Sequence, residues 1–454
     1  MKKVITYGSF DLFHEGHYRL LQRAKALGDY LIVGVTTEGY DETRGKLNVI
    51  DPIMDRIENV RKTGFADQII IEDHAGQKVE DIQKYDVDIF AIGSDWAGAF
   101  DYLKKYCEVV YLERTKGVSS TIRRARNYEI VHMGMMGTGR IADRFAPEAK
   151  FVSGLDVNCV YNHHIDSARY FAEHHQLGFY TDNEEEFYEH VDAVDIATPH
   201  ETHYQYAKNA LLHGKHVLCE KPMTLTKEQT EELYDLAEEK NLVLMEAIKT
   251  AYLPGFIRLL SLIETGIIGE IKDVEACFTR LAPDGCRELI NLESGGSFTE
   301  FGSYTLLPMI KLLGPNYNEV RFESLFAENG LDTYTKAYFS YNDAFALSKT
   351  GLKVKSDGHL VVAGTKGYVF VPAPWWKTAE FEICYEDFSK NDKVYTKYLG
   401  EGLRYELSDF VSTINGFHKG AYKLTRDESV ALAEIIEKYM EWRKGANLIK
   451  EDTE

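Results

Sequence analysis

The sequence predicts an α/β protein of 454 residues with two parallel sheets in succession. Short apolar runs alternate with amphipathic helices, which is typical of a parallel sheet covered by helices on both faces. A glycine-containing loop joins a strand to a helix twice, near residue 8 and near residue 137. Such loops present backbone N–H groups and the positive end of a helix dipole, which bind phosphate.

Length and composition indicate a soluble globular protein of two or three domains. Hydrophobic residues make up 44% of the chain, charged residues 27%, and the formal net charge is -20. A surface this acidic repels nucleic acid and anionic lipid, so we expect no partner of either kind. The six cysteines form no Cys-x-x-Cys pair, and we find no signal peptide and no apolar run long enough to cross a bilayer. These features predict a cytoplasmic protein with free thiols.

Residues 1–127 are predicted to form the first domain, a Rossmann-like sheet of parallel strands. Helices are expected over Tyr18–Leu27, with Gly28 as its stop, and over Pro52–Thr63, with proline at the first helical position. The apolar runs that we interpret as strands are Lys3–Gly8, Tyr30–Val35, Gln68–Ile71, Asp88–Ile92 and Glu108–Leu112.

The loop after the first strand carries the motif His-x-Gly-His. Gly8, Ser9 and Phe10 follow the strand, and His14 and His17 lie at the start of the helix. Two imidazoles at the positive end of a helix can donate hydrogen bonds to phosphate oxygens as charge develops on them. The order of strand, loop, histidines and helix therefore predicts a phosphate site rather than a chance pair of surface histidines.

Other loops of the first domain also offer groups that bind anions. The carboxyl ends of parallel strands meet at one edge of a sheet, so loops that follow different strands converge there. Lys46 lies in a basic, glycine-containing loop, and Arg56 is a further candidate. The residues that follow the fourth and fifth strands are Asp95, Trp96, Arg114, Thr115, Ser119, Ser120 and Thr121.

With these segments in place, residues 1–127 resemble the glycerol-3-phosphate cytidylyltransferase family. The matching segments are Tyr7–His17, Leu27–Gly34, Asp95–Phe100, Cys107–Leu112 and Arg114–Thr121. The resemblance implies attack of a substrate phosphate on the α-phosphorus of CTP, with Mg²⁺ and release of pyrophosphate. It assigns transition-state stabilisation to His14 and His17 and charge neutralisation to Lys46 and Arg114.

A second nucleotide site is predicted directly after the first domain. Residues 128–133 are expected to form a strand, and Gly134 opens the loop. Gly137, Gly139 and Ala142 fit the Gly-x-Gly-x-x-Gly/Ala dinucleotide pattern between a strand and a helix. The residues that we expect to contact this cofactor are Gly137, Thr138, Gly139, Arg140, Ile141, Asn162, His163, Thr198, Pro199, His203 and Glu220.

The end of the next predicted strand bears on the choice of cofactor. It carries Asn162 and His163 and no Asp or Glu to bind a ribose 2′-hydroxyl, as NAD enzymes often require. Asn162 and His163 can instead contact a 2′-phosphate. The pattern favours NADP over NAD.

Residues 128–445 resemble the glucose–fructose oxidoreductase, inositol dehydrogenase and dihydrodiol dehydrogenase family. The resemblance rests on the fingerprint, on Glu220-Lys221-Pro222 at a strand end, and on Gly295–Tyr304. It implies catalysis by Lys221 with Glu300 and Tyr304, which are spaced i and i+4 on one helix face. Glu300 departs from the usual Asp. We expect Lys221 to lower the pKa of Tyr304 and so to favour proton transfer to a carbonyl oxygen.

The resemblance divides this half into a dinucleotide-binding Rossmann domain, residues 128–246, and an α+β domain, residues 247–454, with a largely antiparallel open sheet. Strands are expected over Ile271–Arg280, Tyr334–Tyr341 and Tyr368–Pro372, and a core-packing helix over Glu428–Trp442. We assign no metal-binding residues and expect a homo-oligomer, either a dimer or a tetramer.

Together the two halves predict a bifunctional enzyme that makes a CDP-alditol. One half would reduce a keto or aldehyde precursor with NAD(P)H, and the other would couple an alditol phosphate, first of all glycerol-3-phosphate, to CTP. The resemblance places such products in teichoic acid and capsule synthesis. In two alternatives the oxidoreductase acts on an unrelated or nucleotide-linked substrate, or is a non-catalytic nucleotide-binding dimerisation module.

Overall fold

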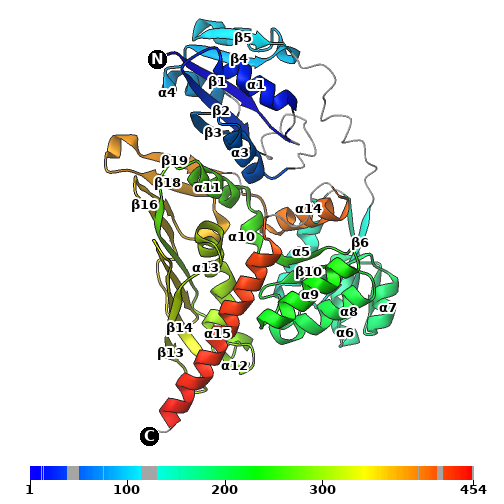
Figure 1. Ribbon diagram of the computed structural model, residues 1–454. Helices are drawn as coiled ribbons and strands as arrows, with labels where there is room; N and C mark the ends of the chain where they lie inside the picture. Colours follow the sequence, from blue (N-terminus) through cyan, green and yellow to red (C-terminus); the bar gives the residue numbers. More distant parts are fainter. Residues whose placement is uncertain are drawn as a thin grey trace. The chain divides into compact units, whose positions relative to one another are not determined.

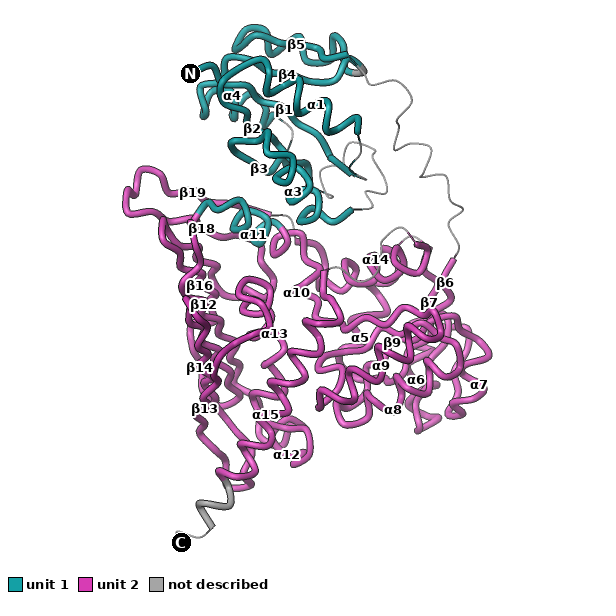
Figure 2. Tube along the Cα trace, in the orientation of Figure 1, with its two compact units in different colours: residues 1–127, 258–267, 417–419 teal, residues 128–257, 268–416, 420–454 magenta. Residues whose placement is uncertain are grey.

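The computed structural model divides the chain into two compact units (Figure 2). The first comprises residues 1–127, 258–267 and 417–419, and the second comprises 128–257, 268–416 and 420–454. The structure describes residues 1–451 except 12, 14, 38–50, 75, 114–129, 153, 397 and 417–422, and it describes the backbone only of 95 and 447–451.

The first unit contains a five-stranded parallel sheet with the strand order β3-β2-β1-β4-β5 (Figure 1). Its core gathers Ile5, Ile32, Phe90 and Ile92 from the central strands. The chain reverses its winding between β1 and β4, and ligands of such sheets bind at that point. The elements are β1 Lys3–Gly8, α1 Glu15–Lys25, β2 Tyr30–Thr36, α3 Ile53–Lys62, β3 Gln68–Glu72, α4 Gln77–Tyr85, β4 Ile89–Gly93, η1 Ser94–Trp96, η2 Asp101–Lys105 and β5 Glu108–Leu112.

The five expected strands agree with the structure to within one residue at each end, whereas the helices differ in detail. Helix α1 begins at Glu15, so His17 lies in its first turn. Pro52 is the N-cap of α3 and precedes its first helical residue. Gly28 was expected as a helix stop, but α1 ends at Lys25. A Cβ at position 28 would lie 2.6 Å from the carbonyl oxygen of Lys2, so this glycine permits close approach of the β1 backbone.

The second unit begins with a six-stranded parallel sheet, ordered β11-β10-β9-β6-β7-β8. Here the winding reverses between β6 and β9. The elements are β6 Val131–Met136, α5 Arg140–Ala149, β7 Leu155–Tyr161, α6 Ile165–His175, β8 Phe179–Thr181, α7 Glu184–Glu189, β9 Ala193–Ile196, η4 His200–Thr202, α8 His203–Leu212, β10 His216–Glu220, α9 Lys227–Glu239 and β11 Leu244–Ala247.

The expectation that Gly134 opens the dinucleotide loop is wrong, because this residue lies inside β6. A Cβ there would lie 2.4 Å from the ring of Phe187, so the glycine makes room for core packing. The turn begins at Gly137. Its φ of +104° is a conformation that side-chain-bearing residues rarely adopt.

An eight-stranded sheet completes the second unit, in the order β13-β14-β15-β12-β16-β17-β18-β19. All its pairs are antiparallel except β12 with β15, which confirms the largely antiparallel sheet predicted for this region. Its strands are β12 Ile271–Thr279, β13 Glu319–Phe326, β14 Asp332–Ser340, β15 Phe345–Gly351, β16 Leu360–Gly364, β17 Tyr368–Val371, β18 Glu380–Cys384 and β19 Asp392–Tyr395.

Helices α13 and α15 lie together on one face of this sheet (Figure 1). Helix α15 runs from Arg426 to Glu451 and is longer than the expected Glu428–Trp442. None of the described helices is long and apolar enough to span a membrane. The helical segments of this region are α10 Lys249–Tyr252, α12 Arg287–Ile290, α13 Ser297–Leu313, η5 Trp375–Lys377, η6 Phe388–Lys390, α14 Leu403–Ile414 and α15 Arg426–Glu451. Helix α11, Pro254–Glu264, is divided between the units, and its residues from 258 onward belong to the first.

Candidate functional sites

The loop after β1 lies at the point where the first sheet reverses its winding. Gly8 ends β1, and a Cβ on it would lie 3.1 Å from the Phe10 ring, so glycine lets this buried ring fold back over the strand end. Phe10 has a positive φ of 52°. Its ring centroid is 5.6 Å from that of His17, and the ring of Phe13 lies 5.5 Å from the same imidazole. Aromatic side chains therefore pack against His17 at the positive end of α1.

Arg56 is a buried brace beneath this loop rather than an exposed phosphate ligand. It is 0% exposed, and its guanidinium donates to the carbonyl oxygens of Ser9 at 2.8 Å, Thr36 at 2.7 Å and Asp51 at 2.9 Å. These three carbonyls belong to the segment after β1, to the last residue of β2 and to the segment before α3. The sequence identified Arg56 as a cation near the loop, but its burial and its partners follow only from tertiary packing.

Some predicted residues of the first site lie outside the described part of the chain. Of the loop after β4, Trp96 is described and is 40% exposed at the sheet edge shared with Gly8, while only the backbone of Asp95 is described. The residues whose placement the structure does not describe are His14, Lys46, Arg114, Thr115, Ser119, Ser120 and Thr121.

In the second unit the predicted glycine loop also lies where the winding reverses. A Cβ at Gly137 would be 2.5 Å from the carbonyl oxygen of Ala197, so the turn packs directly on the backbone that follows β9. Gly139 is the N-cap of α5, and the space around its Cβ position is open. N–H groups at such a helix start can bind a pyrophosphate.

The residues that were predicted to contact the cofactor around this loop differ in their exposure and in the protein groups that they contact. Asn162, just past β7, donates from Nδ2 to the Thr138 hydroxyl at 2.8 Å, and His163 beside it is exposed. Arg140 is ion-paired with Glu288. Ile141 is half-buried in the first turn of α5. The hydrogen bond of Asn162 thus connects the end of β7 to the glycine loop.

His203 is a structural brace between two loops. It is 0% exposed, and its Nδ1 and Nε2 lie 2.8 Å and 2.9 Å from the carbonyl oxygens of Pro222 and Thr198. Burial lowers the pKa of His203 despite both carbonyls. Since both ring nitrogens face the backbone, His203 positions the segment of Thr198 and Pro199 and does not offer a free nitrogen to the cofactor.

Lys221, Glu300 and Tyr304 come together as predicted, but their contacts differ from the expected arrangement. The Nζ of Lys221 donates to the backbone carbonyl of Glu300 at 2.9 Å and lies 3.7 Å from its Oε1. Tyr304, one turn further along α13, has its ring centroid 5.6 Å from the same Nζ. The second carboxylate oxygen of Glu300, Oε2, lies 3.6 Å from Nε2 of the buried His200.

The expectation that Lys221 lowers the pKa of Tyr304 is wrong. Burial raises that pKa well above its usual value, and Glu220, Glu406 and Glu300 raise it further. Burial is the largest of these causes, and the carboxyl groups act in the same direction. Tyr304 is therefore a neutral phenol that can donate its proton.

Buried acids surround this group. Glu220 ends β10, and burial raises its pKa to about 7 although Lys221 and Lys249 oppose the rise. Asp195 on β9 is 1% exposed, and burial raises its pKa well above the usual value. Glu406 on α14 is fully buried, and neither of its oxygens has a hydrogen-bond partner in the described structure. Sequence reasoning missed Glu406, since no motif near it marks the residue.

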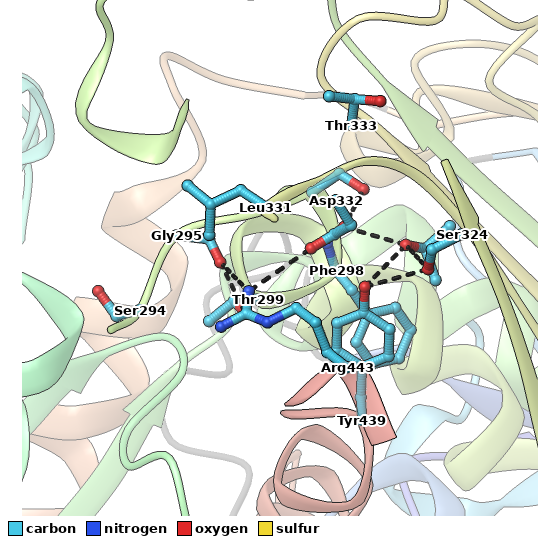
Figure 3. Close-up of polar contacts among 12 residues, drawn as sticks. Ser294, Gly295, Phe298, Thr299, Ser324, Leu331, Asp332, Thr333, Tyr439 and Arg443 are labelled. Carbon is cyan, nitrogen blue, oxygen red and sulfur yellow. Dashed lines mark hydrogen bonds and ion pairs between the residues drawn. The ribbon is translucent and has the colours of Figure 1, made fainter. Parts of the chain in front are cut away.

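The start of α13, which carries Glu300 and Tyr304, is held by a buried carboxylate (Figure 3). Oδ2 of Asp332 accepts hydrogen bonds from Ser297 Oγ at 2.6 Å and from the backbone N–H of Phe298 at 2.9 Å. Arg443 from α15 donates to the carbonyl oxygen of Gly295 at 2.6 Å and lies 3.7 Å from Oδ1 of Asp332. This latch fixes the first turn of the helix and complements its dipole.

Comparisons with known proteins agree with the division into two units. Residues 5–131 match the family model described as cytidylyltransferase-like, and residues 131–248 match that of an oxidoreductase family with an NAD-binding Rossmann fold. A glycerol-3-phosphate cytidylyltransferase from Bacillus spizizenii is 51% identical over 121 residues, which are 27% of this chain and 93% of the relative. One from Staphylococcus aureus is 46% identical over 123 residues, 27% of this chain and 91% of the relative.

The second unit has relatives of its own. The scyllo-inositol 2-dehydrogenase (NADP(+)) of Bacillus subtilis is 26% identical over 318 residues, covering 68% of this chain and 95% of the relative. A 3-ketoreductase from Actinomadura kijaniata, solved with NADP and TDP-benzene, has the same fold, with a TM-score of 0.60 at 21% identity over 68% of this chain and 96% of that one. The chain thus belongs to the glycerol-3-phosphate cytidylyltransferase family in its N-terminal domain, and its residues 131–248 match the model of the oxidoreductase family with an NAD-binding Rossmann fold.

Proposed function

We propose that the protein is a bifunctional enzyme of CDP-alditol synthesis. Residues 1–127 transfer a cytidylyl group from CTP to an alditol phosphate, with glycerol-3-phosphate as the first candidate. Residues 128–246 bind the dinucleotide, residues 247–454 complete the substrate site, and together they reduce a carbonyl precursor. The observation that carries the proposal is the 51% identity of the first domain to a glycerol-3-phosphate cytidylyltransferase, joined in one chain to a second nucleotide cradle.

In the transferase half, an oxygen of the alditol phosphate attacks the α-phosphorus of CTP. One P–O bond forms, the bond to the β-phosphate breaks, and pyrophosphate leaves. His17 at the positive end of α1 donates to the phosphate oxygens as their charge increases. Packing against Phe10 and Phe13 restricts the orientation of its ring. We assign His14, Lys46 and Arg114 to the same task from the sequence motif, with base and phosphate contacts from the loops after β1, β4 and β5.

We propose that Mg²⁺ binds to the phosphates of CTP and enters the site together with the nucleotide. Mg²⁺ commonly binds through substrate phosphates and few protein carboxylates. Among the described residues, the side chains with metal-ligand spacing are Asp143, His174 and His175, and all three lie in the second unit. In the described part of the first unit we therefore assign no protein cage for the ion. Its function would be to neutralise charge on the phosphates of CTP.

In the oxidoreductase half, the glycine cradle at Gly137–Arg140 fits a dinucleotide pyrophosphate. The cofactor, when bound, supplies hydride to the carbonyl carbon. We propose NADP as the preferred form, because Asn162 and His163 follow β7 where an acidic residue would otherwise bind the ribose. The dehydrogenase of Bacillus subtilis named for NADP(+) supports this choice.

Tyr304 completes the reduction by protonating the carbonyl oxygen. The raised pKa keeps its proton in place until charge develops on the substrate oxygen. Lys221, held by the Glu300 carbonyl, supplies the positive charge that stabilises this oxygen. Glu300 in turn lies between Lys221 and His200, which orients both groups. Burial lowers the pKa of His200 well below its usual value, so we treat this ring as neutral.

The two activities are tested in one experiment with the full-length protein. The protein is incubated with CTP, Mg²⁺, NADPH and a panel of keto and aldehyde compounds, with and without phosphate, and CDP-linked products are identified by mass. We expect CDP-glycerol or another CDP-alditol, as used for teichoic acids and capsules. CTP consumption without oxidation of NADPH or NADH by any carbonyl compound would favour a nucleotide-binding module in place of the reductase.

A further inference from the structure

Arg280, the residue that follows β12, has a guanidinium group whose hydrogen bonds are not satisfied. Its Nη2 lies 3.6 Å from Oε1 of the buried Glu288, which is beyond hydrogen-bond length, and the same oxygen is ion-paired with Arg140. The buried Nε and Nη2 of Arg280 have no hydrogen-bond partner in the described structure, while the side chain as a whole is 40% exposed. One carboxylate thus serves two guanidinium groups, and Arg280 can be reached by a further anion.

Two lysines add positive charge around Arg280. The Nζ of Lys355 donates at 3.3 Å to the carbonyl oxygen of the residue before Arg280, and the Nζ of Lys353 donates at 3.1 Å to that of Ala282. Basic side chains here outnumber the carboxylates with which they are ion-paired, so an anion is favoured. The basic side chains are Arg140, Arg280, Lys353 and Lys355, and the carboxylates are those of Glu288 and Asp284.

The guanidinium of Arg280 lies along the same wall as Tyr304. Its central carbon is 5.8 Å from the ring centroid of Phe301. That ring stacks on the ring of Phe278 at 4.2 Å between centroids, and the Phe278 centroid is 5.3 Å from that of Tyr304. Arg280 continues the course of β12 two residues after Phe278, so both side chains point to the face of the sheet that α13 covers. Arg280 and Tyr304 therefore flank the two stacked phenylalanines.

Tyr304 lies between Lys221 and Arg280 around the helix. Each residue of an α-helix turns by about 100°, so Tyr304 projects between Glu300, one turn earlier, and Phe301. Lys221 lies on the side of Glu300, to whose carbonyl oxygen it donates at 2.9 Å, and Arg280 lies on the side of Phe301. Two residues of a strand span about 7 Å, which is the reach of a phosphate ester a few bonds from a carbonyl group.

We propose that Arg280 binds a phosphate group of the carbonyl compound, so that the substrate of the oxidoreductase half is a phosphate monoester of a hydroxyketone or hydroxyaldehyde. A planar guanidinium can give two parallel hydrogen bonds to phosphate. This inference rests on the proposed reductase function and adds the group recognised. It also orders the two reactions. The phosphate is in place before reduction, so the reduced product is itself an alditol phosphate, the acceptor proposed for the transferase half.

The cofactor is a second source of phosphate near this place. Arg140 begins α5 directly after the glycine loop, and it shares Glu288 with Arg280. A pyrophosphate on that loop would accept hydrogen bonds from the N–H groups of the helix start. Arg280 instead follows β12 and lies against Phe301 of α13, so we assign it to the substrate. The Kd for NADPH distinguishes the two sources.

The variant Arg280→Gln tests the proposal with substrates that differ only in a phosphate. The pairs are dihydroxyacetone phosphate with dihydroxyacetone, and ribulose 5-phosphate with ribulose. We expect the KM for the phosphorylated member to rise at least about tenfold, through lost hydrogen bonds to a charged group. The KM for the other member and the Kd for NADPH should stay within about twofold. Arg280→Lys keeps the charge without the planar fork and should give an intermediate KM. The exposed Arg169→Gln, on α6, is the matched control.

Binding without turnover separates this inference from the proposed reaction. Glycerol 3-phosphate, ribitol 5-phosphate and NADPH are all reduced and cannot react with one another. The nicotinamide fluorescence of NADPH-loaded protein reports on the oxidoreductase half alone. We expect a response to at least one of these phosphates, a much weaker one to glycerol and ribitol, and a weaker response to the phosphate in Arg280→Gln. This pattern with no carbonyl compound reduced would overturn the reductase function and leave the phosphate site supported.

Three results would overturn the inference itself. The first is a wild-type KM that is equal or lower for the unphosphorylated member of each pair. The second is an Arg280→Gln variant whose KM rises equally for both members or for neither. If its Kd for NADPH also rises, Arg280 belongs to the phosphates of the cofactor. The third is the absence of any response of the wild type to both alditol phosphates.

Discussion

The Nζ of Lys221 donates a 2.9 Å hydrogen bond to the backbone carbonyl oxygen of Glu300, so the lysine is fixed to the main chain of the helix that carries Tyr304. A bond to the backbone does not depend on the side chain at position 300. This explains how a glutamate can stand where the resemblance expects an aspartate. The ammonium, the carboxylate and the phenol remain together because α13 carries the last two.

The Lys221→Ala variant should lose hydride transfer and retain its cofactor. We expect the rate of NADPH oxidation to fall at least about 100-fold, because no cation remains to stabilise the carbonyl oxygen. The Kd for NADPH, measured by fluorescence, should stay within about twofold. Lys240→Ala, on the exposed end of α9, is the control. Normal turnover by Lys221→Ala would remove this residue from the mechanism.

Shortening Glu300 to aspartate should reduce activity only in part. The carboxylate would retract by about 1.5 Å, one C–C bond, from positions 3.7 Å from Lys221 and 3.6 Å from His200. The bond between Lys221 and the backbone would remain. We therefore expect kcat to fall about three- to tenfold with little change in KM, measured by steady-state kinetics. A rate equal to or above that of the wild type would show that the longer side chain has no role.

The His17→Ala variant should abolish most pyrophosphate release from CTP while the domain stays folded. Loss of one preorganised donor costs about 100- to 1,000-fold in kcat. The test is a coupled pyrophosphate assay, accompanied by circular dichroism to check folding. His74→Ala serves as the comparison, since His74 is exposed and contacts Asp73 and Glu80 on the surface. Equal losses in both variants would argue against a specific role for His17.

The stability of the second unit should fall as the pH rises from about 4.5 to 7, in part because of Glu246. Burial raises the pKa of this carboxyl from 4.5 to about 7, although the N–H of Met223 donates to it at 3.0 Å. In that window the folded protein binds more protons than the unfolded chain, so deprotonation favours unfolding, by on the order of 3 kcal/mol in total. Urea unfolding at several pH values should give a smaller slope for Glu246→Gln; an identical slope would exclude this residue as a source.

The Asp332→Asn variant should weaken the latch at the start of α13. It removes the charge that pairs with Arg443 and that complements the helix dipole, and it leaves a buried guanidinium without its carboxylate. We expect a loss of about 3 kcal/mol in the free energy of unfolding and a lower kcat, since Glu300 and Tyr304 lie within two turns of the latch. The exposed Asp343→Asn is the control. Unchanged urea unfolding and kinetics would show that the carboxylate charge is not needed.

Several features of this protein followed from the sequence alone. The two glycine loops, the parallel strands of both sheets and the placing of Lys221 at a strand end were evident, because periodicity and loop chemistry are local properties. The resemblance of each half to a known family also followed, since the motifs that carry it are short and contiguous.

Tertiary structure decided which polar groups are buried and with what partners. Arg56 is buried and donates to the backbone of the loop after β1. Both ring nitrogens of His203 face backbone carbonyls. The pKa of Tyr304 is raised, whereas the sequence predicted a lowered value. Asp332 holds the start of α13 from β14, and Glu406 is buried on α14, about 30 and 100 residues beyond Tyr304, with no local motif to mark either one. The protonation of a buried group depends on desolvation and on neighbours distant in sequence, and these exist only once the chain has folded.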